Sequence, residues 1–166
     1  VAARAWAQLN PDAFSRKPLS IEDVLNAKMI SDPLTVRDCC LVTDGAGAFV
    51  VTSKERAKDL HRQPISVLGV GHAHWHRQIS CMEDLTLTPA HDSGRAAFKA
   101  AGLSPKDIDI VELYDAFTIN PILFLEDLGF CKKGEGGAFV SGGRIAPGGD
   151  FPRNTNGGGL SCVHRG

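Results

Sequence analysis

The sequence lacks the features that place a protein in a membrane or on a nucleic acid. No apolar run approaches the roughly 20 residues that cross a bilayer, and the opening VAARAWAQLN lacks the basic-then-apolar order of a signal peptide. The 18 basic residues nearly balance the 19 acidic ones, so the overall charge favours neither nucleic acid nor an anionic membrane. We therefore expect no membrane span, no nucleic-acid partner and a cytoplasmic location.

The cysteines lack the pattern of a disulfide framework. Their number is odd, and no two of them are spaced as CxxC. They are Cys39, Cys40, Cys81, Cys131 and Cys162. Such a pattern is typical of a protein from a reducing compartment.

The composition is that of an ordinary globular protein. Hydrophobic residues make up 43% of the 166 and charged residues 22%, far from the composition of a disordered chain. This length suits one domain with a sizeable core. Runs rich in β-branched and aromatic residues alternate with segments of helical pattern. The alternation predicts an α/β layered fold.

Local signals place the individual elements. We expect strands at 47–53, 65–71, 108–114 and 138–143, and helices near the start, at 21–26 and 54–60, through 95–101 and at 117–129. Ser53 is the predicted cap of the helix at 54–60. Asp92 or Ser93 is the predicted cap of the helix through 95–101, and Gly102 supplies its stop.

Three histidines follow the second predicted strand at a spacing of two: His72, His74 and His76. In a continued strand the three imidazoles would share one face and could bind zinc or copper. No cysteine or carboxylate nearby has a supporting spacing. We therefore expect a solvated loop and no metal.

Tyr114 and Asp115 stand where the strand at 108–114 meets the next helix. Functional groups gather at such junctions of α/β sheets, so both are candidate catalytic residues. The alternative is structural: an aspartate there often caps the helix, and a tyrosine often packs with its hydroxyl bonded.

The last candidate stretch, NTNGGGLSCVHRG, covers residues 154–166. Its turn consists of Asn156, Gly157, Gly158 and Gly159. Backbone N–H groups of such a turn can converge on a carbonyl or enolate oxygen, and His164 beside it can act as general acid or base. Cys162 is either a nucleophile paired with this histidine or a small buried side chain.

Three stretches, taken together, resemble the thiolase superfamily. They are TDGAGAFVVTS at 43–53, AHDSGRAAFKAAGLSPKDIDIVELYDAF at 90–117, and NTNGGGLSCVHRG at 154–166. The closest resemblance is to the lipid-transfer-protein branch, which is related to sterol carrier protein X. It covers essentially the whole chain.

This resemblance implies a thiolase-like α/β fold, in which two similar βαβαβαββ halves stack as five layers. Residues 1–60 would match the end of the first half, and 61–166 an incomplete second half. The chain would begin after the segment with the acylated cysteine of the family and stop before the part with its acid/base cysteine. None of the five cysteines lies at either place.

The resemblance also implies roles for two residues. His164 matches the histidine of a Gly-His-Pro motif that activates the nucleophile and helps form an oxyanion hole, although Val163 and Arg165 replace the glycine and proline. Tyr114 takes the first place of the Asn-Glu-Ala-Phe motif, or of its His-Asp version, whose first residue serves the oxyanion hole through a water. A phenol donates one strong hydrogen bond but cannot reproduce the paired groups of an amide.

The function implied first is acyl transfer of the acetyl-CoA C-acetyltransferase or 3-ketoacyl-CoA thiolase type on lipid or sterol acyl-CoA, with this chain inactive alone. Tyr114 leaves two alternatives open. One is an aldolase component that cleaves acyl-CoA side chains with a zinc-ribbon/OB-fold partner, and the other is a non-catalytic lipid or acyl-CoA binding module. We expect no cofactor beyond the CoA thioester substrate, and a homodimer or homo-oligomer. Arg144, Arg153 and Lys132 are candidate contacts for the CoA phosphates.

Overall fold

The computed structural model describes residues 1–164. Its helices are α1 (Ala2–Leu9), α2 (Ile21–Leu25), α3 (Lys54–Ala57), α4 (Ala90–Ala101), α5 (Ile119–Asp127), α6 (Gly136–Phe139) and α7 (Gly158–Ser161). Short 3-10 turns are η1 (Val36–Asp38), η2 (Ile79–Cys81) and η3 (Pro105–Asp107), and the strands β1 (Met29–Ser31) and β2 (Leu34–Thr35) pair antiparallel. Within these residues no helix combines the length and the apolar character that crossing a membrane requires.

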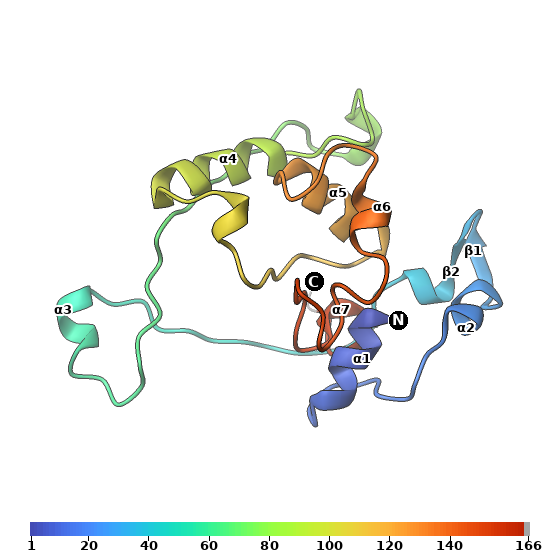
Figure 1. The fold of residues 1–166 in the computed structure, drawn as a ribbon, viewed down its shortest axis with the longest axis horizontal. Coiled ribbons are helices and arrows are strands. Elements are labelled where there is room, and N and C mark those ends of the chain that lie inside the picture. The colour runs from blue at the N-terminus through green and yellow to red at the C-terminus, as the bar shows by residue number, and fades with distance from the viewer. Residues whose placement is uncertain (165–166) are drawn as a thin grey trace.

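The packed part of the molecule contains two groups of helices (Figure 1). In one group α5 lies between α4 and α6, and in the other α1 packs against α7. The main core consists of the buried side chains of Val111, Leu125, Ile145 and Phe151. Trp6 of α1 reaches this region, where its indole N–H donates to the carbonyl of Ile145 at 2.8 Å.

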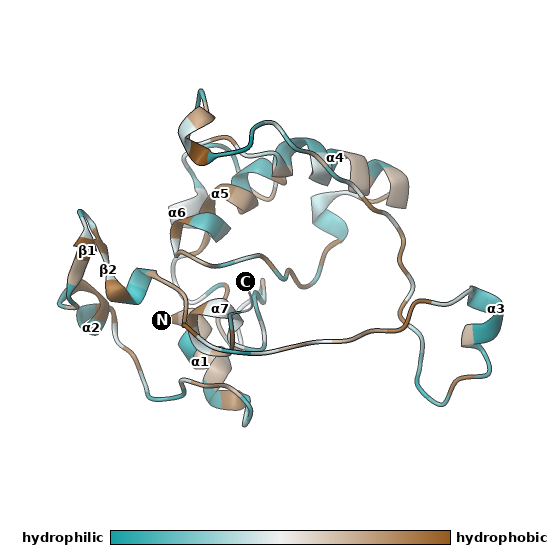
Figure 2. Cartoon of the chain, turned by 180° about the vertical axis from the view of Figure 1, so that it is seen from behind, coloured by the Kyte–Doolittle hydropathy of each residue, from teal (hydrophilic) through white to brown (hydrophobic). Residues whose placement is uncertain are grey.

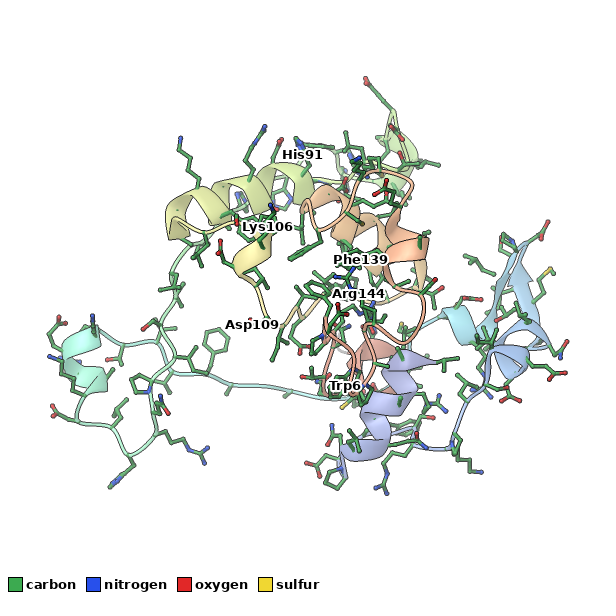
Figure 3. The ribbon with its side chains drawn as sticks, viewed as in Figure 1. Trp6, His91, Lys106, Asp109, Phe139 and Arg144 are labelled. Carbon is green, nitrogen blue, oxygen red and sulfur yellow. The ribbon has the colours of Figure 1, made fainter. Side chains whose placement is uncertain are left out.

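Arg144 lies on the rim of the same core, close to Phe139 of α6 in Figure 3. Its guanidinium stands 4.0 Å from the centre of the Phe139 ring, a favourable cation–π arrangement. Its Nε also donates to the carboxylate of Asp150 at 3.1 Å. The glycine-rich segment before the candidate site is therefore attached to α6 by a stacked and paired arginine.

Most predicted helices are confirmed, because their end signals are local. The hydroxyl of Ser53 accepts the N–H of Arg56 and caps α3, and Gly102 ends α4 in the left-handed conformation. The predicted cap of α4 is wrong: the helix begins at Ala90, before Asp92 and Ser93. The side chain of Thr88 instead accepts the N–H of Ala90 at 3.3 Å.

The predicted strands are confirmed only in part. Segments 47–53 and 65–71 run as open chain, and among residues 1–164 no neighbouring strand pairs with either. In the stretch 108–114 only Val111 forms a bridge, parallel to Arg153. The strand prediction at 138–143 is wrong: α6 forms instead, because the side chain of Glu126 accepts the N–H of Gly136 and starts a helical turn there.

The open segments leave a long apolar surface in solvent. In Figure 2 the ribbon that leads to α3 and back is brown, the colour of hydrophobic residues, over much of its length. Phe49 and Val50 are each 88% exposed, and Val67 is also exposed. Gly71 lies against the backbone of Ser93 in α4, so one side of the returning segment is covered. Apolar surface of this extent drives association.

We expect the chain to self-associate through this surface, and the double substitution Val50→Lys, Val67→Lys to reduce association, because two charges would have to be desolvated. Light scattering across a concentration series measures the mass. Val36→Lys, which replaces an exposed valine of η1, is the control and leaves association unchanged. A parent chain that stays monomeric at high concentration would contradict the expectation.

Candidate functional site

The site is built where two distant stretches run side by side. The N–H of Val111 donates to the carbonyl of Pro152 at 3.2 Å, and the N–H of Asn154 donates to the carbonyl of Val111 at 3.0 Å. These bonds form a short parallel ladder. Tyr114 follows directly on one side of it and the glycine-rich turn on the other.

The side chain of Asn154 prolongs this ladder. Its Oδ1 accepts the N–H of Leu113 at 2.7 Å, and its Nδ2 donates to the carbonyl of Leu113 at 2.7 Å. The backbone of Asn154 has a positive φ of 49°, a conformation that asparagine tolerates better than most residues. The main chain therefore turns away, while the side-chain amide pairs the peptide just before Tyr114.

The glycine-rich turn is closed by hydrogen bonds within the protein. The N–H groups of Gly157 and Gly158 donate to the Asn154 carbonyl and to the Asn156 side chain, at 2.9 and 2.8 Å. That of Gly159 donates to the carboxylate of Asp115 at 2.7 Å. A Cβ at Gly158, whose φ is 60°, would overlap the same carboxylate, so glycine is required there. The oxyanion role predicted for 156–159 stays a prediction, with three of its N–H groups already bonded.

Asp115 also forms a buried ion pair with Arg153. Asp115 Oδ2 lies 3.5 Å from Arg153 Nη2, and both side chains are buried. Burial lowers the pKa of the Arg153 guanidinium, and the Asp115 carboxylate opposes that change. The pair fixes the turn to the residue that follows Tyr114. The predicted phosphate contact of Arg153 is wrong, because its guanidinium is enclosed.

The backbone of His164 is held in place by hydrogen bonds to Thr43. Its N–H donates to Oγ1 of Thr43 at 3.0 Å, and the Thr43 hydroxyl donates to the His164 carbonyl, also at 3.0 Å. Val163, which stands where the resemblance predicts glycine, packs against the small cluster of Ala7, Ala13 and Cys162. Arg165 lies outside the described residues.

Tyr114 and His164 meet across this arrangement. The Tyr114 Oη and the His164 Nε2 are 2.9 Å apart and share a hydrogen bond, although 50 residues separate them in sequence. The ring centres are 5.6 Å apart. Tyr114 is 57% exposed, so the phenol is accessible from solvent. A phenol bonded to an imidazole can pass a proton from one oxygen to one nitrogen and back.

The other candidates lie apart from this pair. Cys162 is buried in contact with Ala7 and Ala13, an environment typical of a small core residue. The rings of His72 and His74 touch edge to face at 4.7 Å between centres. Within residues 1–164, no three His, Cys, Asp or Glu side chains gather as metal ligands.

A cavity of about 340 Å³ lies between Trp75 and Leu87, and neither Tyr114 nor His164 lines it.

Comparison with known proteins identifies the family. A family model described as thiolase C-terminal domain-like matches residues 71–166, which is more than half of the chain. The chain belongs to the thiolase family. The thiolase-like fold predicted from the sequence is confirmed by a solved "Ltp2-ChsH2(DUF35) aldolase", which superposes with a TM-score of 0.92 at 35% identity, over 99% of this chain and 44% of that one.

Two relatives show the range of names within this thiolase family. Benzoylsuccinyl-CoA thiolase subunit BbsB of Thauera aromatica is 40% identical over 99% of this chain and 43% of its own length. The 17-hydroxy-3-oxo-4-pregnene-20-carboxyl-CoA lyase of Mycobacterium tuberculosis (strain ATCC 25618 / H37Rv) is 39% identical over 96% of this chain and 43% of its own length. The chain thus spans less than half the length of each relative.

Sequence reasoning missed three residues that position the pair: Thr43, Arg153 as an internal cation, and Asn154. Thr43 and Asn154 stand inside the quoted stretches, TDGAG and NTNGGG, but no local pattern tells a threonine or asparagine that bonds a distant backbone from one in solvent. Arg153 follows a proline in a glycine-rich run, where exposure is the ordinary expectation. Only the pairing of distant segments reveals their roles.

Replacing Asp115 with asparagine should lower the free energy of unfolding by about 3 kcal/mol, because the buried Arg153 guanidinium loses its counter-charge. Urea unfolding followed by tryptophan fluorescence measures the change. Asp109→Asn, at an exposed position, is the matched control and should change stability little. An equal change in the free energy of unfolding for both substitutions would show that the buried ion pair does not account for the effect.

The shared hydrogen bond predicts a particular histidine tautomer. If the Tyr114 hydroxyl donates to Nε2, the proton of neutral His164 sits on Nδ1. Two-bond ¹H–¹⁵N correlation spectra distinguish the tautomers, and Tyr114→Phe should shift the Nε2 resonance of His164 by removing the donor. The exposed His91 is the internal control. Identical His164 signals in both proteins would contradict the bond.

Proposed function

We propose that this chain supplies the proton-transfer pair for cleaving a carbon–carbon bond in an acyl-CoA thioester, by retro-aldol chemistry on a 3-hydroxyacyl-CoA. The observation that carries the proposal is the 2.9 Å hydrogen bond between Tyr114 Oη and His164 Nε2. It gives the phenol, which is otherwise a weak base near neutral pH, a neighbour that accepts its proton. Similarity to the solved aldolase and to the mycobacterial lyase supports the same reaction class.

In the proposed reaction, the Tyr114 oxygen takes the proton of the substrate 3-hydroxyl group while its own proton passes to Nε2 of His164. The oxygen electron pair forms a carbonyl, the bond between C2 and C3 breaks, and its electrons move into the thioester as an enolate. The imidazolium then returns its proton through Tyr114 to C2. The products are a shortened acyl-CoA and a ketone or aldehyde, with no net change in protons and no redox step.

The surrounding residues give this pair a fixed geometry. Asn154 holds the peptide before Tyr114, and the Asp115–Arg153 pair holds the residue after it. Fixed donors lower the barrier because they need not reorganise during the reaction. The proposed substrate is the CoA thioester of a lipid or sterol side chain, no separate cofactor is required, and a homodimer is the proposed assembly. A small zinc-ribbon/OB-fold protein is the proposed partner, by analogy with the DUF35 component named in the solved aldolase.

Acyl transfer is the second candidate. It is favoured by His164, which stands at the place of the histidine in the Gly-His-Pro motif, and by similarity to the thiolase subunit of Thauera aromatica. Thiolysis requires an accessible thiolate as acyl acceptor. Burial raises the pKa of the Cys40 thiol, and Cys162 is enclosed by Ala7 and Ala13. Neither thiol has a nucleophilic setting, and the acylated cysteine that acyl transfer needs is expected outside this chain. The candidate stands second because the group bonded to His164 is the Tyr114 phenol.

The deciding experiment offers the chain two substrates and identifies products by mass spectrometry, with and without a zinc-ribbon/OB-fold partner. A branched 3-hydroxyacyl-CoA reports retro-aldol cleavage, and a 3-oxoacyl-CoA with free CoA reports thiolysis. We expect ketone and shortened acyl-CoA from the first substrate only, and only when the partner is present. Tyr114→Phe should reduce that rate at least about 100-fold, the usual contribution of a general acid–base group.

His164→Gln should reduce the same rate, whereas His91→Gln, at an exposed helix position, should not. Products from the oxo substrate alone would favour acyl transfer. If neither substrate reacts under either condition, while a non-cleavable acyl-CoA still shifts the His164 resonances, both enzymatic candidates fail and a non-catalytic acyl-CoA binding module remains.

A further inference from the structure

One segment far upstream in the sequence is bonded to both halves of the site. In this segment, residues 38–43, the N–H of Cys40 donates to the carbonyl of Ala116 at 2.8 Å, and that of Leu41 to the carbonyl of Gly159 at 2.9 Å. Ala116 lies two residues after Tyr114, and Gly159 closes the turn before His164. We call residues 38–43 the strap, because it connects the two stretches that carry the pair.

The first end of the strap is anchored beside α5. The N–H of Thr118 donates to the carbonyl of Asp38 at 2.9 Å, and its hydroxyl donates to Asp38 Oδ1 at 2.7 Å. Burial raises the pKa of the Asp38 carboxyl, but hydrogen bonds from Thr35 and Thr118 outweigh burial and hold the pKa below its ordinary value. The carboxylate is therefore the bonded form, and this end of the strap is fixed.

The other end of the strap is Thr43, which holds His164. One hydroxyl accepts the His164 N–H and donates to the His164 carbonyl, so a single side chain satisfies both polar groups of that residue. Threonine suits this task because its hydroxyl is both donor and acceptor and its branched Cβ restricts χ1. Thr43 is half-buried, which limits competition from water.

From these contacts we propose that Thr43 is a positioning residue for the proposed reaction: it keeps the His164 imidazole within hydrogen-bond reach of Tyr114. Tyr114 has its own supports in Asn154 and Asp115, whereas the N–H and the carbonyl of His164 both bond the hydroxyl of Thr43. Removing the Thr43 hydroxyl frees the backbone of His164 and leaves the supports of Tyr114 in place. The effect of Thr43 on the reaction rests on the proposed function. Its effect on the position of the His164 imidazole does not, because that position can be measured without turnover.

The test compares Thr43→Val, which keeps the shape and loses the hydroxyl, with Thr43→Ser, which keeps the hydroxyl. Thr52→Val is the control, since Thr52 is exposed in the open segment before α3. The first readout is the ¹⁵N resonance of His164 Nε2, compared with its value in Tyr114→Phe. We expect Thr43→Val to move it to the Tyr114→Phe position, and Thr43→Ser and Thr52→Val to keep the parent value.

The second readout is cleavage of the branched 3-hydroxyacyl-CoA. We expect Thr43→Val to lower kcat by about 10- to 100-fold with little change in KM, because misplacing a reacting group by about 1 Å has effects of this size. Thr43→Ser should restore most of the rate. A parent-like Nε2 resonance in Thr43→Val would overturn the positioning role whatever the activity. A shifted resonance in Thr43→Val, with no turnover by the parent chain, would support the positioning role and count against the proposed function alone.

Discussion

The two hydrogen bonds between the Asn154 side chain and the Leu113 peptide are the constraint on which the site depends. They end a short parallel ladder at a point where two segments of the chain diverge, one toward Tyr114 and one toward the glycine-rich turn. Because the amide supplies one donor and one acceptor in fixed relation, it replaces a peptide unit without leaving the Leu113 N–H or carbonyl unpaired.

The charges of Asp115 and Arg153 have a different role from the exposed hydrogen bond between Tyr114 and His164. Asp115 and Arg153 are enclosed together, and a buried ion pair contributes little net stability compared with apolar packing of the same shape. Its effect here is geometric, because the carboxylate has a second partner in the N–H of Gly159. Three groups from two distant stretches of the chain satisfy one another in this arrangement, which defines where the turn lies relative to Tyr114.

How far the sequence predicts this molecule depends on the range of the interactions involved. Helix ends such as Ser53 and Gly102 depend on neighbours within four residues and are predicted correctly. The strands at 47–53 and 65–71 have the right side-chain pattern, but pairing depends on other segments, and none in residues 1–164 pairs with them. Tyr114 and His164 are found through a motif, whereas Thr43 has no local signal, because its partner is 121 residues away.

The site is therefore an outcome of long-range folding. The strap, the Tyr114 stretch and the final turn are separate in sequence, and each contributes polar groups that only the other two satisfy. Loop-closure entropy opposes each of these contacts until several form together, so the pair should assemble cooperatively with the ladder at Val111 and Asn154. By contrast, apolar side chains of the segments on either side of α3, such as Phe49, Val50 and Val67, are exposed. The Tyr114–His164 hydrogen bond can thus form in one part of the chain while another part still presents an open apolar surface.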